Sequence, residues 1–266
     1  MKRLHKLFIT VIATLGMFGV MTFGLPTQPQ NVIPTVHADV NSSVDTSQEF
    51  QNNLKHAIGN LSFQYVNGIY ELNNNQTNLN ANVNVKAYVQ NTIDNQQRPS
   101  TANAMLDRTI RQYQNRRDTT LPDANWKPLG WHQVVTNDHY GHAVDKGHLI
   151  AYALAGNFKG WDASVSNPQN VVTQTAHSNQ SNQKINRGQN YYEGLVRKAV
   201  DQNKRVRYRV TPLYRNDTDL VPFAMHLEAK SQDGTLEFNV AVPNTQASYT
   251  MDYATGEITL NQKKSN

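Results

Sequence analysis

Three alternating segments in the last third of the chain constrain its fold more than any other feature. Apolar residues occupy every second position of residues 206–210, 223–229 and 236–242, and the positions between them are polar or charged except for Ala224 and Ala241. This period of two is typical of strands that bury one face. Asp233-Gly234 separates the second and third segments and predicts a tight hairpin turn. We therefore expect consecutive antiparallel strands in this region.

Upstream segments carry other patterns. Apolar residues recur at helical spacing in residues 191–200, and a weaker pattern predicts a second helix over residues 102–116. Residues 131–135 follow an aromatic turn and predict a short strand. Helices that precede a run of antiparallel strands place the chain in the α+β class.

The first 38 residues have the pattern of an export signal. Three basic residues precede the uncharged stretch 7–25, and Val36-His37-Ala38 offers small residues at the positions that signal peptidase reads. We expect cleavage before Asp39. The apolar stretch also approaches the ~20 residues that a membrane-spanning helix needs, so an uncleaved membrane anchor is the alternative.

The chain contains no cysteine. An exported fold of this kind depends on its core or on bound ions, not on disulfides. Residues 39–95 are rich in Asn, Gln, Ser and Thr, which predicts a loosely ordered arm or a segment lying along the surface. A single globular domain is then expected over residues 96–266.

Local charge is more informative than total charge. The formal net charge is +5, and three of the positive charges lie in the leader. Two basic clusters can supply a field that attracts phosphate, although solvated faces explain either cluster equally well. They consist of Arg108, Arg111, Arg116 and Arg117, and of Arg197, Lys198, Lys204, Arg205, Arg207 and Arg209.

Asp145-Lys146-Gly147-His148 is the strongest candidate for chemistry. His148 can act as a general base, because the unperturbed pKa of histidine lies near neutrality. Gly147 would permit a sharp turn, and Lys146 would hold a phosphate as a point charge. Asp145 would fix the turn through backbone amides.

A polar segment at residues 170–180 supplies the other groups that phosphodiester hydrolysis needs. The amide oxygen of Asn179 suits a hard cation such as Mg²⁺, which keeps most of its waters. Glu193 can hold a water bound to that cation, and Gln174 and Gln180 can bond sugar or phosphate oxygens without reading bases. Together these residues predict a one-metal nuclease site.

These motifs resemble the DNA/RNA non-specific endonucleases, the ββα-metal group, whose signature is Asp-Arg-Gly-His followed by a metal-binding asparagine. The resemblance covers roughly residues 95–260. It is closest to the EndA-type nucleases of Gram-positive bacteria, at residues 98–104, 130–134, 142–145, 167–168, 189–193 and 205–210.

The resemblance implies a central antiparallel sheet flanked by helices, with a ββα-metal active-site element. It implies His148 as general base, Asn179 as the direct Mg²⁺ ligand and Glu193 as the supporting carboxylate, with Mn²⁺ as an alternative cation. The reaction would be endonucleolytic cleavage of DNA, and also of RNA, leaving 5′-phosphate ends. Substrate contacts are expected at His142, Gln174, Gln180, Arg205 and Arg207, the last two from the basic cluster.

Two positions depart from the family pattern. Lys146 replaces the signature arginine, which removes a planar fork for phosphate. His177 stands where relatives can carry an aromatic residue, and it either stacks on a base or sugar or caps the helix.

The sequence leaves the biological setting open. The enzyme is either secreted or tethered at the outer face of the membrane through residues 7–25, where it would process DNA during uptake. A non-catalytic nucleic-acid-binding surface protein and a sheet-based adhesion module are the alternative classes. No protein partner is indicated.

Overall fold

The computed structural model describes residues 46–115 and 125–261. The leader at residues 1–38, with its 7–25 stretch, and the arginines at positions 116 and 117 lie outside these ranges. Among the described residues, no helix combines the length and the apolar character needed to cross a membrane.

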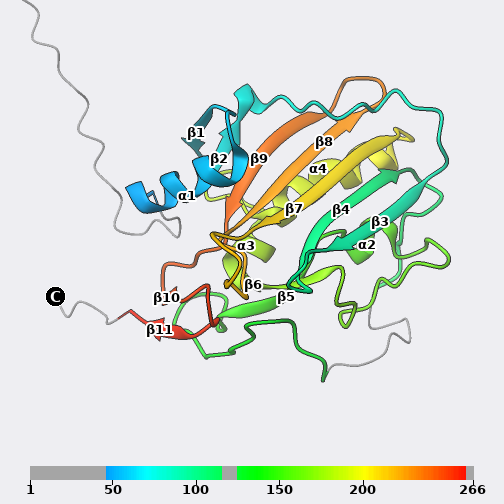
Figure 1. Cartoon of the computed structure of the whole chain (residues 1–266). Helices are drawn as coiled ribbons and strands as arrows, with labels where there is room; N and C mark the ends of the chain where they lie inside the picture. The colour runs from blue at the N-terminus through cyan, green and yellow to red at the C-terminus, as the bar shows by residue number, and fades with distance from the viewer. Residues whose placement is uncertain (1–45, 116–124, 262–266) are drawn as a thin grey trace, which may run out of the picture. The chain divides into compact units, whose positions relative to one another are not determined.

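An antiparallel sheet of seven strands forms the centre of the described fold (Figure 1). Its order is β1-β2-β9-β8-β7-β4-β3, and every neighbouring pair is antiparallel. The strands are β1 (Phe63–Val66), β2 (Ile69–Leu72), β3 (Tyr88–Ile93), β4 (Pro99–Leu106), β7 (Val206–Leu213), β8 (Ala224–Ser231) and β9 (Glu237–Pro243). The three alternating segments are consecutive strands as predicted, and the α+β class is confirmed.

One face of this sheet carries α2 (Tyr152–Ala155) and α4 (Gln189–Asp201) (Figure 1). The main core lies here, where α4 packs Val196 and Val200 against the inward side chains of β7, including the fully buried Tyr208. The helix predicted at 191–200 is therefore correct. Because α4 is held by this large apolar contact, its polar residues are fixed relative to the sheet.

The opposite face is covered by α1 (Gln48–Ile58) and by the segment that follows β2. Phe50 of α1 packs on Tyr70 and Phe223 with ring centroids 5.3 Å apart in each pair. Ser47 caps this helix by accepting a hydrogen bond from the Phe50 amide. Helices thus flank the sheet on both faces.

The described part of the expected Asn/Gln-rich arm is an integral part of the fold. It supplies α1, β1, β2, β3 and the short η1 (Asn73–Asn75), so the expectation of a loosely ordered arm is corrected. The stretch after η1 follows the sheet surface, which agrees with the alternative expectation of a segment lying along the surface. Thr77 donates to the buried Glu228 at 2.7 Å, and Asn75 accepts from the Asn239 amide at 3.0 Å.

Two local predictions were wrong. The helix expected at 102–116 is β4 followed by irregular chain as far as residue 115; Ala104, Met105 and Leu106 are consecutive buried apolar residues of a strand that pairs with β3 and β7. Residues 131–135 form no strand. Instead, the side chain of Gln133 bonds the amide of Ala143 and both backbone groups of Val144, which replaces strand pairing.

A second layer holds the chemistry-bearing segment. β5 (Val144–His148) pairs antiparallel with β6 (Val171–Thr175), and α3 (Ala176–Gln180) follows β6 directly. A further pair, β10 (Tyr249–Met251) and β11 (Ile258–Leu260), packs its apolar residues against Val144. The element of two strands and one helix that the family resemblance implies is present.

Candidate active site

The β5–β6 pair and α3 fix where the signature side chains point. Lys146 and His148 share one face of β5, whereas Asp145 and Gly147 face the other way. α3 starts abruptly after Thr175, whose hydroxyl caps it by accepting from the Ser178 amide at 3.0 Å. This cap sets the direction in which the helix presents Asn179 and Gln180.

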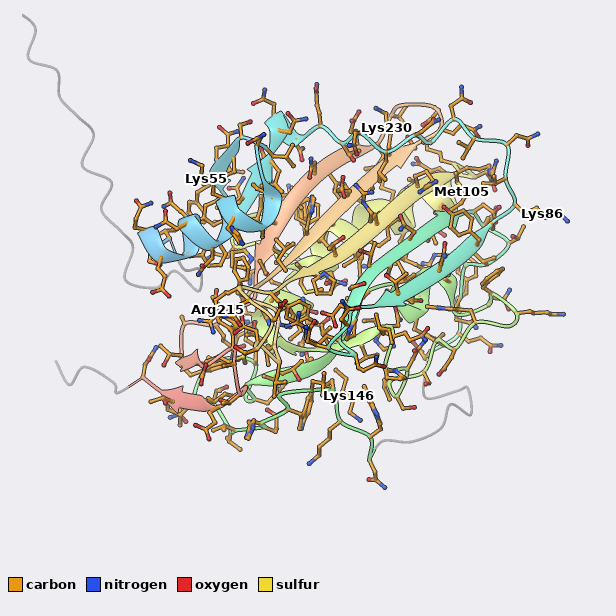
Figure 2. The ribbon with its side chains drawn as sticks, viewed as in Figure 1. Lys55, Lys86, Met105, Lys146, Arg215 and Lys230 are labelled. Atoms are coloured by element: carbon orange, nitrogen blue, oxygen red, sulfur yellow. The ribbon has the colours of Figure 1, made fainter. Side chains whose placement is uncertain are left out.

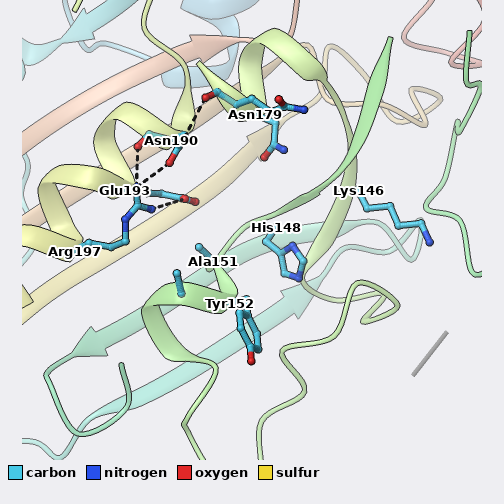
Figure 3. A pocket seen from close by; sticks show the side chains of 10 residues that line it. Lys146, His148, Ala151, Tyr152, Asn179, Asn190, Glu193 and Arg197 are labelled. Carbon is cyan, nitrogen blue, oxygen red and sulfur yellow. Dashed lines mark hydrogen bonds and ion pairs between the residues drawn. The ribbon is translucent and has the colours of Figure 1, made fainter. Parts of the chain in front are cut away.

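A polar pocket of about 510 Å³ opens between β5, α3, α2 and α4 (Figure 3). It brings together the predicted base, the predicted metal ligand and the predicted supporting carboxylate, three residues that are distant in sequence. Its lining residues are Lys146, His148, Ala151, Tyr152, Ala153, Asn179, Gln180, Asn190, Glu193 and Arg197.

His148 is held by backbone carbonyl groups. Its Nε2 lies 3.1 Å from the Ser164 oxygen and 3.3 Å from the Ala163 oxygen, and the residue is 7% exposed. Carbonyl oxygens only accept, so a neutral ring that donates to them carries its proton on Nε2. The lone pair of that tautomer is on Nδ1, which is the nitrogen suited to accept a proton.

Asp145 organises the amides of α3. Its Oδ2 accepts from Asn179 Nδ2 at 2.8 Å and from Gln180 Nε2 at 2.7 Å, and its Oδ1 lies 2.9 Å from His142 Nε2. The expectation that Asp145 bonds backbone amides is therefore corrected. With its nitrogen bound to the carboxylate, Asn179 keeps its oxygen for a ligand.

Glu193 is a buried carboxylate on α4, with 8% of the residue exposed. Gln189 donates to its Oε1 at 2.8 Å, and Arg197 approaches its Oε2 at 3.4 Å. Burial raises the pKa of Glu193, and these two donors oppose that shift. Gln189 and Arg197 were not predicted as site residues, although their spacing of four on each side of Glu193 puts all three on one helix face.

Gly147 is required for packing, not for a turn. Its backbone lies outside the left-handed region, and an added Cβ would stand 2.2 Å from Oε1 of Gln174. Gln174 is fully buried and donates to Ser178 Oγ at 3.0 Å and to Gln189 Oε1 at 3.2 Å. It supports the site from inside, so the expected substrate contact at Gln174 is corrected.

The structure does not bring Arg205 and Arg207 to the pocket. Arg207 lies over the ring of Tyr88 at 5.6 Å, and Arg205 donates to the carbonyl of Val85. Because Val206, the residue between them, lies in the core with α4, both guanidinium groups lie toward the opposite side of the sheet. Figure 2 shows Lys146 at the β5–β6 pair, well separated from Lys86 and Lys230.

His177 is buried beside the site and does not contact the pocket. Its Nδ1 lies 3.0 Å from the Tyr140 hydroxyl, and burial together with the nearby His139 lowers its pKa to about 4. The side chain of Thr175 caps α3, so the interpretation of His177 as the helix cap is corrected, whereas stacking of His177 on a base or sugar stays a prediction.

The donor set suits a weakly held hard cation. Among the described residues, no group of three or more His, Cys, Asp or Glu side chains is placed to hold a metal ion. Asn179 offers one amide oxygen beside the buried carboxylate of Glu193. Such a set fits Mg²⁺, which binds few protein ligands and retains its waters, better than a closed Zn²⁺ site.

A strand pair and two helices that bring a histidine, an amide and a buried carboxylate into one pocket have the features of a nuclease. The family model described as DNA/RNA non-specific endonuclease matches residues 66–265, so the match begins within the segment that was expected to be an arm. The chain belongs to this family. It is an endonuclease, a phosphodiester hydrolase that acts on nucleic acid.

Solved structures agree with this assignment. NucA from Streptococcus agalactiae with magnesium bound is 97% identical over 82% of this chain and 99% of that chain, with a TM-score of 0.81. Its metal-free form is 94% identical over 83% and 100% of the two chains, with a TM-score of 0.78. The Sda1 nuclease with bound zinc shares the fold. It is 19% identical over 65% of this chain and 82% of that chain, with a TM-score of 0.52.

Proposed function

We propose that this endonuclease cleaves DNA and RNA without sequence preference, uses one Mg²⁺ ion and leaves 5′-phosphate ends. The observation that carries the proposal is the joint presence of His148, Asn179 and Glu193 in one pocket. The magnesium-bound structure of the S. agalactiae nuclease supports the choice of cation. Mn²⁺ would replace Mg²⁺, because both prefer oxygen ligands.

His148 acts as the general base. The Ala163 and Ser164 carbonyls hold its Nε2 proton, so Nδ1 takes the proton of the attacking water. The tether orients the ring before substrate binds, which lowers the entropic cost of reaching the reactive geometry. Attack on phosphorus with departure of the 3′ oxygen leaves the 5′-phosphate.

Asn179 would hold the cation through its amide oxygen, and Glu193 would hold one of the cation's waters. When bound, Mg²⁺ stabilises negative charge on the phosphorane and the leaving oxygen. Asp145 keeps the Asn179 amide in the orientation that exposes its oxygen. Gln189 and Arg197 keep the Glu193 carboxylate in place.

The substrate is held by its phosphates. Arg197 lines the pocket and offers a guanidinium group near Glu193, and Lys146 adds a point charge at the rim. Gln180 also lines the pocket and contacts His142 and Asp145. None of these groups forms a base-reading surface, which accounts for cleavage without a recognition sequence.

Supercoiled plasmid tests the proposal directly. Purified protein should convert it to nicked and then linear DNA with Mg²⁺, and EDTA should abolish the conversion. Products should accept label from polynucleotide kinase only after phosphatase treatment. Cleavage that persists in EDTA, or ends that accept label without phosphatase, would contradict the proposed mechanism.

The leader carries a separate proposal, that the enzyme is exported and released before Asp39. Its support is the charge pattern and the small residues of residues 1–38. Intact mass of the protein recovered from culture medium should correspond to a chain that starts at residue 39. Activity confined to the membrane fraction, with the leader attached, would favour the tethered alternative.

A further inference from the structure

A second, smaller cavity lies on the other side of α3 from the active-site pocket. Its volume is about 160 Å³, below the ~300–1,000 Å³ of pockets that hold drug-sized ligands. It therefore has room for one small group. Asp138, His139 and Tyr140 line it from the turn before β5, and His177 lines it from α3.

One helix, α3, contributes to both cavities. α3 presents His177 to the small cavity and Asn179 and Gln180 to the active-site pocket. Tyr140 of the small cavity is also connected to the active-site residue Asp145: its carbonyl oxygen lies 2.7 Å from Nδ1 of His142, whose Nε2 contacts Asp145. α3 therefore contributes side chains to both cavities.

The lining suits a flat, neutral, hydrogen-bonding group. The rings of His139 and Tyr140 lie 3.8 Å apart between centroids, and His139 is exposed. Gln183 and Asn186 contribute amide side chains that make no hydrogen bond within the described residues. No lysine or arginine lines the cavity, and Asp138 contributes a carboxylate, which disfavours phosphate as the occupant.

We propose that this cavity is a nucleobase subsite, which receives an unpaired base of the strand held in the active site. The proposal rests on the proposed nuclease function. Base–aromatic stacking tolerates any base, because every base has a π-face, so the subsite adds affinity without adding a recognition sequence. A base buried in a duplex cannot enter, so the subsite favours single-stranded substrate.

The test uses a His148→Ala background, so that the strands survive in Mg²⁺. Two labelled single strands of about 12 nucleotides are compared by fluorescence anisotropy, one with thymine bases and one abasic at every position. The pocket variant is His139→Ala with Gln183→Ala. Its matched control is His132→Ala with Asn182→Ala, which removes an exposed imidazole and an exposed amide outside the cavity.

The control variant should bind the abasic strand about fivefold or more weakly than the thymine strand, as expected when one or more bases stack on the protein. The pocket variant should lose affinity for the thymine strand and keep its affinity for the abasic strand. If the ratio of the affinity for the thymine strand to the affinity for the abasic strand were equal in the two variants, the subsite would be overturned and the nuclease function would stand. Failure of the control to bind either strand, with no plasmid cleavage by the wild type, would overturn the proposed function itself.

Discussion

The side-chain nitrogen of Gln189 lies 2.6 Å from the carbonyl oxygen of His148 and 2.8 Å from Oε1 of Glu193. One buried amide on α4 therefore bonds the strand that carries the base and the carboxylate that supports the metal site. Its own oxygen accepts from Gln174 at 3.2 Å, so every hydrogen-bonding group of this side chain faces a partner.

Gln189→Met should remove these bonds at nearly constant volume. We expect the Mg²⁺ concentration for half-maximal cleavage to rise about 10–100-fold, as is typical when support of a metal site is lost. Thr77→Val is the matched control, because it removes a buried bond to Glu228 on the other side of the sheet. Equal Mg²⁺ requirements in the two variants, at similar thermal stability, would reduce Gln189 to a packing role.

Asp145→Leu should disorder the amides of α3, because leucine offers no oxygen to accept from Asn179 and Gln180 as the carboxylate does. Calorimetric titration with Mg²⁺ should show affinity about 10–100-fold lower than in the wild type. Metal affinity that is unchanged would mean that Asn179 is oriented by its helix alone.

Arg197 and Arg207 should differ in their contribution to substrate binding. In a His148→Ala background, Arg197→Gln should reduce the slope of log affinity against log salt by about one, the value for one phosphate contact. Arg207→Gln should leave the slope unchanged, since its side chain lies over Tyr88 away from the pocket. A slope that falls in Arg207→Gln and stays unchanged in Arg197→Gln would restore the original expectation that Arg207 binds substrate.

Stability should fall in mild acid because of His177. Its pKa is about 4 in the folded protein and 6.5 when unperturbed, so the folded state binds fewer protons between these values. The contribution is complete above pH 6.5 and is lost as the pH falls toward 4. The shift corresponds to about 3 kcal/mol of unfolding free energy.

Denaturant unfolding at about pH 7 and about pH 4.5 measures this loss. His177→Gln should reduce the difference between the two conditions, whereas His132→Gln, at an exposed position, should leave it as in the wild type. An unchanged difference in His177→Gln would assign the acid sensitivity to other buried groups, such as His226.

Local patterns predicted the parts of the fold that local physics controls. The C-terminal strands each bury one face, so their alternation was visible, and α4 has one apolar side. β4 could not be identified in this way, because Ala104, Met105 and Leu106 are consecutive, apolar and all buried, which hides the period of two. The role of the Asn/Gln-rich segment depends on long-range contacts such as Thr77 with Glu228, which composition does not reveal.

The candidate site divides in the same way. His148, Asn179 and Glu193 were predicted from their chemistry, and they line one pocket. The partners of these residues were not predictable, since Gln189 reaches the His148 carbonyl across 41 positions of the chain. Gly147 was interpreted as a turn residue and Gln174 as a substrate contact. The sequence does not show that the side chain of Gln174 packs against the backbone of Gly147.

The cleavage rate of His148→Ala measures the role of the base most directly. With plasmid DNA and saturating Mg²⁺, we expect a folded protein whose rate is about 10²–10⁴-fold below the wild type. Added imidazole should restore part of the activity by taking the place of the lost ring, and it should not stimulate Asn179→Ala. A correctly folded His148→Ala variant that cleaves at the wild-type rate would contradict the assignment of His148 as the general base.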